Sequence, residues 1–281
     1  MIPTELNPAW VDVNFRSVAP TIGKRCGLIK EAPAERNARF PCRAMGPEVK
    51  IDLLPESDWR GLVDAKEGRS NRDIIDGPKD QKSEGSCTGF AMDMTFETKF
   101  MRTYGVKHRI RCSPQSTYQT CGSSSGSGST LSCNLIKARD VGYIPSDTPE
   151  NRERFNGVVL KEVGWSQRSN PRPDGWQEVA KNFRVDEWAE INSMAAFATC
   201  LILDIPVLYG RNGHALCAIA LVWRNGRWYV MYLNSWGDWG DEGYGYDVFS
   251  SRLLGYGCYV PISIVHPDIS GFEVPAPKLV V

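Results

Sequence analysis

The sequence lacks several features that would each point to a definite class of protein. Lysine plus arginine equals aspartate plus glutamate at 33 each, so no overall charge favours nucleic acid or an anionic membrane as a partner. The longest apolar run, 215–223, is far shorter than the ~20 residues of a membrane helix. The first ten residues lack a basic start followed by an apolar core, which argues against a secretory signal. We therefore expect a protein made in the cytoplasm that binds neither nucleic acid nor membrane.

Residues that bind metals are also scarce or wrongly spaced. The nine cysteines contain no Cys-x-x-Cys pair, and the chain has only three histidines, His108, His214 and His266. No zinc site, and no other metal or organic cofactor, is predicted. Without an export signal, most of the cysteines are expected to be buried reduced thiols, and one or two disulfides remain compatible with the count. The odd number of cysteines raises the question of whether one thiol is reactive.

The composition changes along the 281 residues in a way that suggests how the chain is organised. Residues 1–50 are rich in proline and arginine and have little periodicity, which predicts an extended arm lying on its own domain or on a partner. The main domain is expected over 51–268, followed by a tail over 269–281. The segment 121–133 is mostly glycine and serine and is expected to be a mobile connector.

Helical patterns come early in the domain and strand patterns come late. Apolar residues spaced by three and four predict helices, and runs of branched and aromatic residues predict strands. Two helices and three strands are expected, over 86–105, 191–203, 205–209, 215–223 and 227–233. The order predicts an α+β protein with a helical lobe over about 76–186 and an antiparallel β lobe over about 187–268.

Cys87 is the best candidate for a reactive thiol because it opens the first of these helices. Its sulfur would lie at the positive end of the helix dipole, where a thiolate is favoured. A base for this thiol has to come from the three histidines, and His214 begins the 215–223 strand pattern. Asn234 ends the next strand and could orient the imidazole, which is the arrangement of a catalytic triad.

The register of the hairpin formed by these two strands decides whether His214 and Asn234 can touch. A strict two-residue Asn225-Gly226 loop would place them on opposite faces. A three-residue loop starting at Arg224, or a bulge, would place them on one face. A contact between the two side chains therefore predicts an odd loop or a bulge.

Two further side chains could complete such a site. Gln81, six residues before Cys87, could place its amide beside the Cys87 backbone N–H and stabilise an oxyanion. Trp236, two residues after Asn234, could cover the contact between Asn234 and His214 and exclude water from it.

These residues resemble the papain-like cysteine peptidases. Four segments carry the resemblance: 80–91 is similar to the family's glutamine-to-cysteine segment, 214–215 to its histidine motif, 234–244 to its Asn-Ser-Trp-Gly signature and 54–60 to the start of its mature domain. The spacing from Cys87 to His214 is close to the ~130–150 residues typical of the family.

The resemblance implies a two-lobed fold, with a helical lobe that carries the nucleophile and an antiparallel β lobe that carries the base. The implied roles are oxyanion donor for Gln81, nucleophile for Cys87, base for His214, orienting residue for Asn234 and shield for Trp236. No cofactor is implied.

The chain also departs from the family pattern. Glu84 stands where the family has cysteine and Thr88 where it has tryptophan, and the charge of Glu84 is expected to raise the pKa of the nucleophile. The family's glycine-rich substrate-binding segment has its nearest match in Gly126, Ser127 and Gly128. The residues before Leu54 are shorter than a typical pro-segment and lack its helical pattern, so no inhibitory pro-segment is predicted.

Three functions are compatible with these features. The leading hypothesis is a cysteine endopeptidase acting on peptides or proteins through Cys87, His214, Asn234 and Gln81. The second is a structural subunit of a larger assembly, such as a viral particle, with a partner contacting residues 1–50. The third is another thiol enzyme, such as a transglutaminase-like or cell-wall peptide hydrolase, which would share the cysteine and histidine alone.

Overall fold

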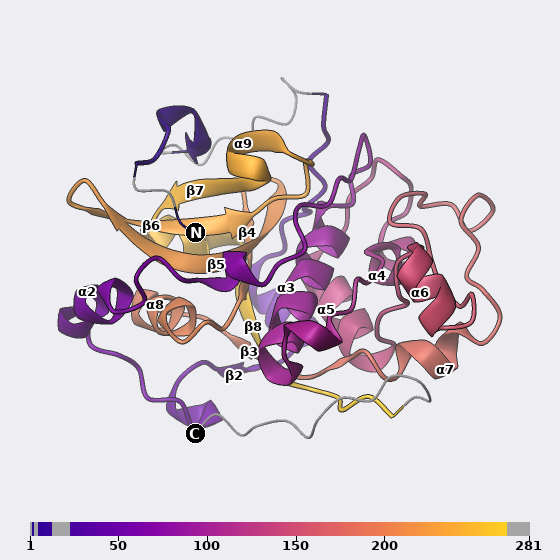
Figure 1. Ribbon diagram of the computed structural model, residues 1–281, viewed down its shortest axis with the longest axis horizontal. Helices are drawn as coiled ribbons and strands as arrows, with labels where there is room; N and C mark the ends of the chain where they lie inside the picture. The colour runs from indigo at the N-terminus through magenta and orange to yellow at the C-terminus, as the bar shows by residue number, and fades with distance from the viewer. Residues whose placement is uncertain (1, 3–4, 13–22, 269–281) are drawn as a thin grey trace.

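The computed structural model describes residues 2, 5–12 and 23–268, which form two lobes (Figure 1). A sheet containing β4–β7 dominates the left of the view, and helices α3–α7 lie on the right. Helix α3 lies between the two lobes and packs on β5 through Phe90, Met94 and Cys217. The expected α+β architecture with two lobes is therefore confirmed.

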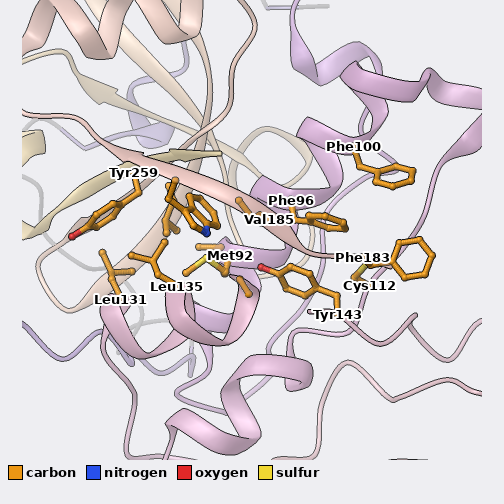
Figure 2. Close-up of a cluster of buried hydrophobic side chains, with 14 of the residues drawn as sticks. Met92, Phe96, Phe100, Cys112, Leu131, Leu135, Tyr143, Phe183, Val185 and Tyr259 are labelled. Atoms are coloured by element: carbon orange, nitrogen blue, oxygen red, sulfur yellow. The ribbon is translucent and has the colours of Figure 1, made fainter. Parts of the chain in front are cut away.

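The helical lobe is built around one long helix. Its helices are α3 (Cys87–Tyr104), α4 (Gln115–Cys121), α5 (Leu131–Asp140), α6 (Pro149–Arg154) and α7 (Trp176–Ala180). Apolar side chains surround α3, which ends at Gly105, where φ is +92° and the glycine N–H bonds to the carbonyl of Met101. Figure 2 shows the core beside α3, where Phe96 stacks on Tyr143 with 4.7 Å between ring centroids. This packing fixes the helix that begins at Cys87.

The sheet has eight strands in the order β1-β7-β6-β5-β4-β8-β3-β2. The strands are β1 (Val11–Asp12), β2 (Arg43–Ala44), β3 (Val185–Glu190), β4 (Val207–Arg211), β5 (His214–Arg224), β6 (Arg227–Leu233), β7 (Tyr244–Val248) and β8 (Cys258–Ile264). Helices α2 (Glu56–Asp64) and α8 (Met194–Ile202) lie together below it in Figure 1, and Trp59 and Phe197 pack into the same core as β4 and β5. A short α9 (Trp239–Glu242) follows β6.

A bulge in β5 sets the register of the central hairpin. Arg224 pairs with Arg227 across a two-residue Asn225-Gly226 turn, so the loop itself is even. Between Ala218 and Ala220 the register shifts by one residue, and the strands then continue in the new register to the Cys217–Leu233 pair. The expected odd loop or bulge is therefore present, as a bulge in the strand.

The arm is more structured than its composition predicts. It contributes α1 (Pro33–Arg39) and the short strands β1 and β2, which pair in parallel with β7 and β3. The strands β1 and β2 fit the predicted extended arm, whereas helix α1 was not predicted. The division at residue 50 stays a prediction, and the expected tail, 269–281, lies outside the described residues.

The cysteines are mostly, but not all, reduced. Cys87, Cys112, Cys200, Cys217 and Cys258 are buried thiols. Cys121 and Cys133 form a disulfide that joins the end of α4 to α5. The segment 121–133 is therefore closed at its ends, and the expectation of a plain connector is wrong.

Candidate active site

His214 and Asn234 form the best-defined contact of the site. The Nε2 of His214 lies 2.9 Å from the Oδ1 of Asn234, which also accepts the backbone N–H of Ser235. Because that oxygen is an acceptor, Nε2 carries the proton and Nδ1 carries the lone pair. Nδ1 is buried and has no hydrogen-bond partner among the described residues. This nitrogen is free to accept a proton from a neighbouring group.

Trp236 covers the imidazole. Its ring stacks on that of His214 with 4.5 Å between centroids and 22° between planes, and both residues are buried. Burial lowers the pKa of His214 to about 3, and the nearby charge of Arg211 lowers it further, whereas the Asn234 hydrogen bond opposes the shift. The imidazole is therefore neutral near pH 7 in this state.

Cys87 lies at the start of α3 and is completely buried. Its sulfur accepts the backbone N–H of Gly27 at 3.3 Å and also interacts with the backbone N–H of Ala215, the residue after His214. The sulfur therefore lies beside the first residues of β5. Burial raises the pKa of the thiol to about 12, although these N–H groups favour the thiolate.

Gln81 joins the helical lobe to the sheet lobe. Its backbone N–H donates to the carbonyl of Ser235, and its side-chain Oε1 accepts the Ser235 hydroxyl at 2.5 Å. These bonds turn the amide nitrogen inward, where it donates to the carbonyl oxygens of Arg25 at 2.8 Å and Glu84 at 2.5 Å. The amide can therefore donate to a carbonyl oxygen of a chain lying over it, as an oxyanion donor would. Ser235 was missed in the sequence, although it lies inside the Asn-Ser-Trp motif.

Glu84 holds the loop before the nucleophile in place. One carboxylate oxygen accepts the backbone N–H groups of Gly164 at 2.8 Å and Trp165 at 3.0 Å, and the other accepts the Gln115 side-chain amide at 2.8 Å. The pKa of Cys87 is raised as expected, but its main cause is burial and not the charge of Glu84. Glu84 acts as a polar clamp at the position where the family has a cysteine.

A segment of the arm crosses the site, and we refer to residues 24–29 as the strap. Arg25 accepts a hydrogen bond from Gln81, and Gly27 donates one to Cys87. Lys24 adds an ion pair of 2.5 Å with Asp80. The Leu28 N–H donates to the carbonyl of Gly213, the residue before His214. The strap thus contacts the candidate nucleophile, the loop before it and the residue before the candidate base.

Backbone pairing holds the strap on its other side. The Ser129 N–H donates to the carbonyl of Gly27 at 2.7 Å, and the Ile29 N–H donates to the carbonyl of Ser129 at 2.9 Å. Leu28 is 8% exposed and packs into the helical-lobe core, whereas Ile29 is 47% exposed. A Cβ atom on Gly27 would collide with the carbonyl oxygen of Gly85, so this approach requires glycine.

The glycine-rich loop lies against the strap. A Cβ on Gly126 would collide with the Arg25 guanidinium, and one on Gly128 would collide with the carbonyl of Gly27. The Ser127 hydroxyl instead accepts the N–H groups of Ser123 and Ser124, both at 2.9 Å, and so stabilises the loop itself. Gly126 and Gly128 therefore lie against the strap, and a substrate-binding role for this loop stays a prediction.

The contacts of the strap were not predicted from the sequence. No inhibitory pro-segment is predicted there because the arm lacks a long helical pattern, yet the strap contacts Cys87, Gln81 and Gly213. Most of its contacts use backbone atoms, which leave little trace in side-chain patterns. Ser129 was missed for the same reason, although its hydroxyl also bonds Thr88 at 2.5 Å.

No protein-family model and no curated protein sequence matches this chain at a significant level. Solved structures with the papain-like fold do match it. Xylellain, a cysteine protease from Xylella fastidiosa, has 14% identity and a TM-score of 0.54, with 87% of this chain and 98% of that chain covered. Digestive procathepsin L2 from Tenebrio molitor has 16% identity and a TM-score of 0.61, covering 87% and 80%.

ProCathepsin B S9 from Trypanosoma congolense has 12% identity and a TM-score of 0.56, with 90% of this chain and 89% of that chain covered. At these identities the comparisons show the fold, and this chain has the papain-like fold. Within the described residues, no helix combines the length and hydropathy that a membrane span needs. No group of three or more potential metal ligands converges in the same part of the chain.

Proposed function

We propose that this chain with the papain-like fold is a cysteine peptidase that hydrolyses peptide bonds in peptide or protein substrates. The hydrogen bond between His214 and Asn234 carries the proposal, because it leaves Nδ1 unprotonated and without a partner among the described residues. The Cys87 sulfur interacts with the backbone N–H of Ala215, the residue after His214, which supports a pairing of the two side chains. The papain-like fold supports this class of reaction.

In the proposed mechanism, His214 Nδ1 takes the proton of the Cys87 thiol, and the thiolate attacks the carbonyl carbon of the substrate. The Gln81 amide donates to the developing oxyanion. His214 then protonates the leaving amine, and a thioester remains on Cys87. Water, deprotonated by His214, hydrolyses the thioester and restores the thiol.

The strap affects how this activity can be observed. In the described state, the Gln81 amide is bonded to the Arg25 carbonyl and the sulfur is bonded to the Gly27 N–H, so neither is available to substrate. Burial keeps Cys87 and His214 neutral. We propose that the strap has to leave before substrate binds, and that water entering the site then favours the thiolate–imidazolium pair.

The test uses the full chain and a Leu28→Asp variant, which weakens strap docking. A peptide carrying a thiol-reactive group is added near pH 7, and labelled residues are mapped by mass spectrometry. We expect rapid labelling of Cys87 in the Leu28→Asp variant and its loss when His214→Ala is added. Hydrolysis of a fluorogenic peptide library should follow the same order.

The same experiment separates the competing functions. Labelling of Cys87 no faster than that of the half-buried Cys42 thiol, with no effect of His214→Ala, would favour a structural subunit. The arm that suggested an assembly partner is held by contacts within the chain itself. A different thiol enzyme would retain labelling that depends on His214 but would leave the fluorogenic peptide library uncleaved.

A further inference from the structure

The strap carries a second cysteine close to the candidate nucleophile. Cys26 immediately precedes Gly27, whose backbone nitrogen lies 3.3 Å from the Cys87 sulfur. Standard covalent geometry places the Cα of Cys26 about 2.5 Å from that nitrogen, and therefore within about 6 Å of the sulfur. Because the side chain of Cys26 extends from that Cα, a rotation of the side chain and a small movement of the strap would bring the two sulfurs to the S–S bonding distance of ~2.05 Å.

The side chain of Cys26 begins beside the residue that precedes β5. Its Cβ would lie 3.7 Å from a Cβ built on Gly213, the residue before His214. Cys26 also interacts electrostatically with Cys87. Because Gly213 has no side chain, the space between Cys26 and the start of β5 is not filled by that residue.

Other cysteines are poorly placed to compete for either sulfur. Cys121 and Cys133 are bonded to each other. Cys112, Cys200, Cys217 and Cys258 are buried in the cores, and Cys42 lies near Glu190. Cys26 is partly exposed, so an oxidant in solution can reach it while Cys87 is covered.

We propose that Cys26 and Cys87 form a reversible disulfide that locks the strap over the active site under oxidising conditions. The consequence of this bond, a closed active site, rests on the proposed peptidase function, whereas formation of the disulfide does not. The existing strap contacts are hydrogen bonds, one ion pair and one buried leucine, all of which break reversibly. The disulfide adds a covalent bond that only a reductant breaks.

Hydrogen peroxide is one oxidant that balances the reaction. The Cys26 thiolate attacks a peroxide oxygen, the O–O bond breaks, and a sulfenic acid and one water form. The Cys87 sulfur then attacks the sulfenic sulfur, the S–S bond forms, the S–O bond breaks, and the hydroxyl leaves as a second water with the thiol proton. Two thiols lose two electrons in total and one peroxide is reduced to two waters.

The test treats the full chain with hydrogen peroxide, blocks the remaining thiols and maps disulfide-linked peptides by mass spectrometry without reduction. We expect a Cys26–Cys87 linked peptide that dithiothreitol removes. Cys42→Ser, which removes another partly buried thiol, is the matched control and should give the same linked peptide. Cys26→Ser should give none, and its Cys87 should be recovered as thiol or as a higher oxide that dithiothreitol does not reduce.

A second measurement tests whether the disulfide prevents the thiol-reactive peptide from reaching Cys87. After peroxide, labelling of Cys87 by the thiol-reactive peptide should be lost and then restored by dithiothreitol in the Cys42→Ser variant. In Cys26→Ser, any loss of labelling should resist dithiothreitol.

The proposal is overturned if Cys26–Cys87 linkage is no more abundant than Cys42–Cys87 linkage, or if peroxide oxidises the two sulfurs independently. Disulfide mapping needs no peptidase activity, so it can succeed or fail independently of the hydrolysis experiment.

Discussion

His214 and Asn234 share one face of the β5–β6 hairpin because β5 has one extra residue between Ala218 and Ala220. Without the bulge, the even turn would direct the imidazole and the carboxamide to opposite faces. The bulge therefore determines whether the Asn234 oxygen can fix the tautomer of His214.

The first prediction concerns this hydrogen bond. Asn234→Ala removes the acceptor that holds the proton on Nε2, so the imidazole should populate the wrong tautomer and lose its orientation. We expect peptide hydrolysis in the Leu28→Asp background to fall by roughly 10- to 1,000-fold, with a smaller loss for Asn234→Gln. Steady-state kinetics should show the loss mainly in kcat. Unchanged kcat would argue against an orienting role for Asn234.

The second prediction compares adjacent strap residues that differ in burial. Burying a leucine contributes about 2 kcal/mol, so Leu28→Asp should expose the site and accelerate Cys87 alkylation roughly 30-fold. Ile29→Asp changes an exposed side chain and should alter the rate less than threefold, which makes it the matched control. Similar acceleration in both variants would show that charge, rather than loss of buried apolar contact, releases the strap.

A third prediction tests the Glu84 clamp. Glu84→Leu leaves the N–H groups of Gly164 and Trp165 without their acceptor, and each such loss costs about 1–3 kcal/mol. It also removes one of the two acceptors of the Gln115 amide, which keeps the carbonyl of Glu162. Urea unfolding should show a large loss of stability. Glu84→Gln keeps one side-chain oxygen for the backbone donors and should lose less. Equal stability of the two variants would contradict the clamp.

A fourth prediction concerns a buried charge beneath the site. Lys79 donates to Asp93 at 2.8 Å, Glu97 at 2.7 Å and the carbonyl of Cys112 at 2.7 Å, while its own carbonyl accepts the N–H of Gly237. Lys79→Met leaves the carboxylates unpaired and should lower the free energy of unfolding by about 3–5 kcal/mol.

Lys82→Met is the control for that substitution. The Lys82 side chain is 67% exposed, and its loss should change stability by no more than about 0.5 kcal/mol. If the two variants lost a similar free energy of unfolding, the buried ion pairs of Lys79 would contribute no more stability than the exposed ion pair of Lys82.

The fifth prediction follows from the lowered pKa of His214. The folded protein does not protonate this residue until about pH 3, whereas the unfolded chain does so near its ordinary pKa of 6.5. Protons therefore favour the unfolded state across this window, and stability should fall as pH decreases from about 6.5 to 3.

His214→Gln removes that titration, so its stability should depend less steeply on pH than that of the wild type. Urea unfolding at pH 7 and pH 4.5 measures the difference. Equal pH dependence of the two proteins would mean that the buried imidazole does not contribute to acid sensitivity.

Much of the fold and of the candidate site could be predicted from the sequence. The α3 pattern and its stop at Gly105, the β5–β6 hairpin and the need for an odd register follow from side-chain periodicity and turn chemistry. The positions of Gln81, Cys87, His214 and Asn234 follow from the family resemblance, and their catalytic roles stay predictions.

The strap could not be predicted in the same way. Gly27 and Ser129 bind through backbone atoms, whose pairing does not require a particular side-chain pattern. Because the sequence shows no export signal, most cysteines were expected to be reduced, and the Cys121–Cys133 disulfide was not predicted. The hydrogen bond between Glu84 and Gly164 joins residues 80 positions apart, which local sequence patterns do not reveal.

The collision that any Cβ on Gly27 would make with Gly85 has a consequence for how the covered state responds to mutation. At position 27, alanine, serine and aspartate should all shift the equilibrium toward the uncovered protein, because the first side-chain carbon already lacks room. At position 28, the shift toward the uncovered protein should instead become larger as the substituted side chain becomes less hydrophobic. A single added methyl group thus suffices to favour an exposed sulfur, without altering any residue that takes part in the proposed chemistry.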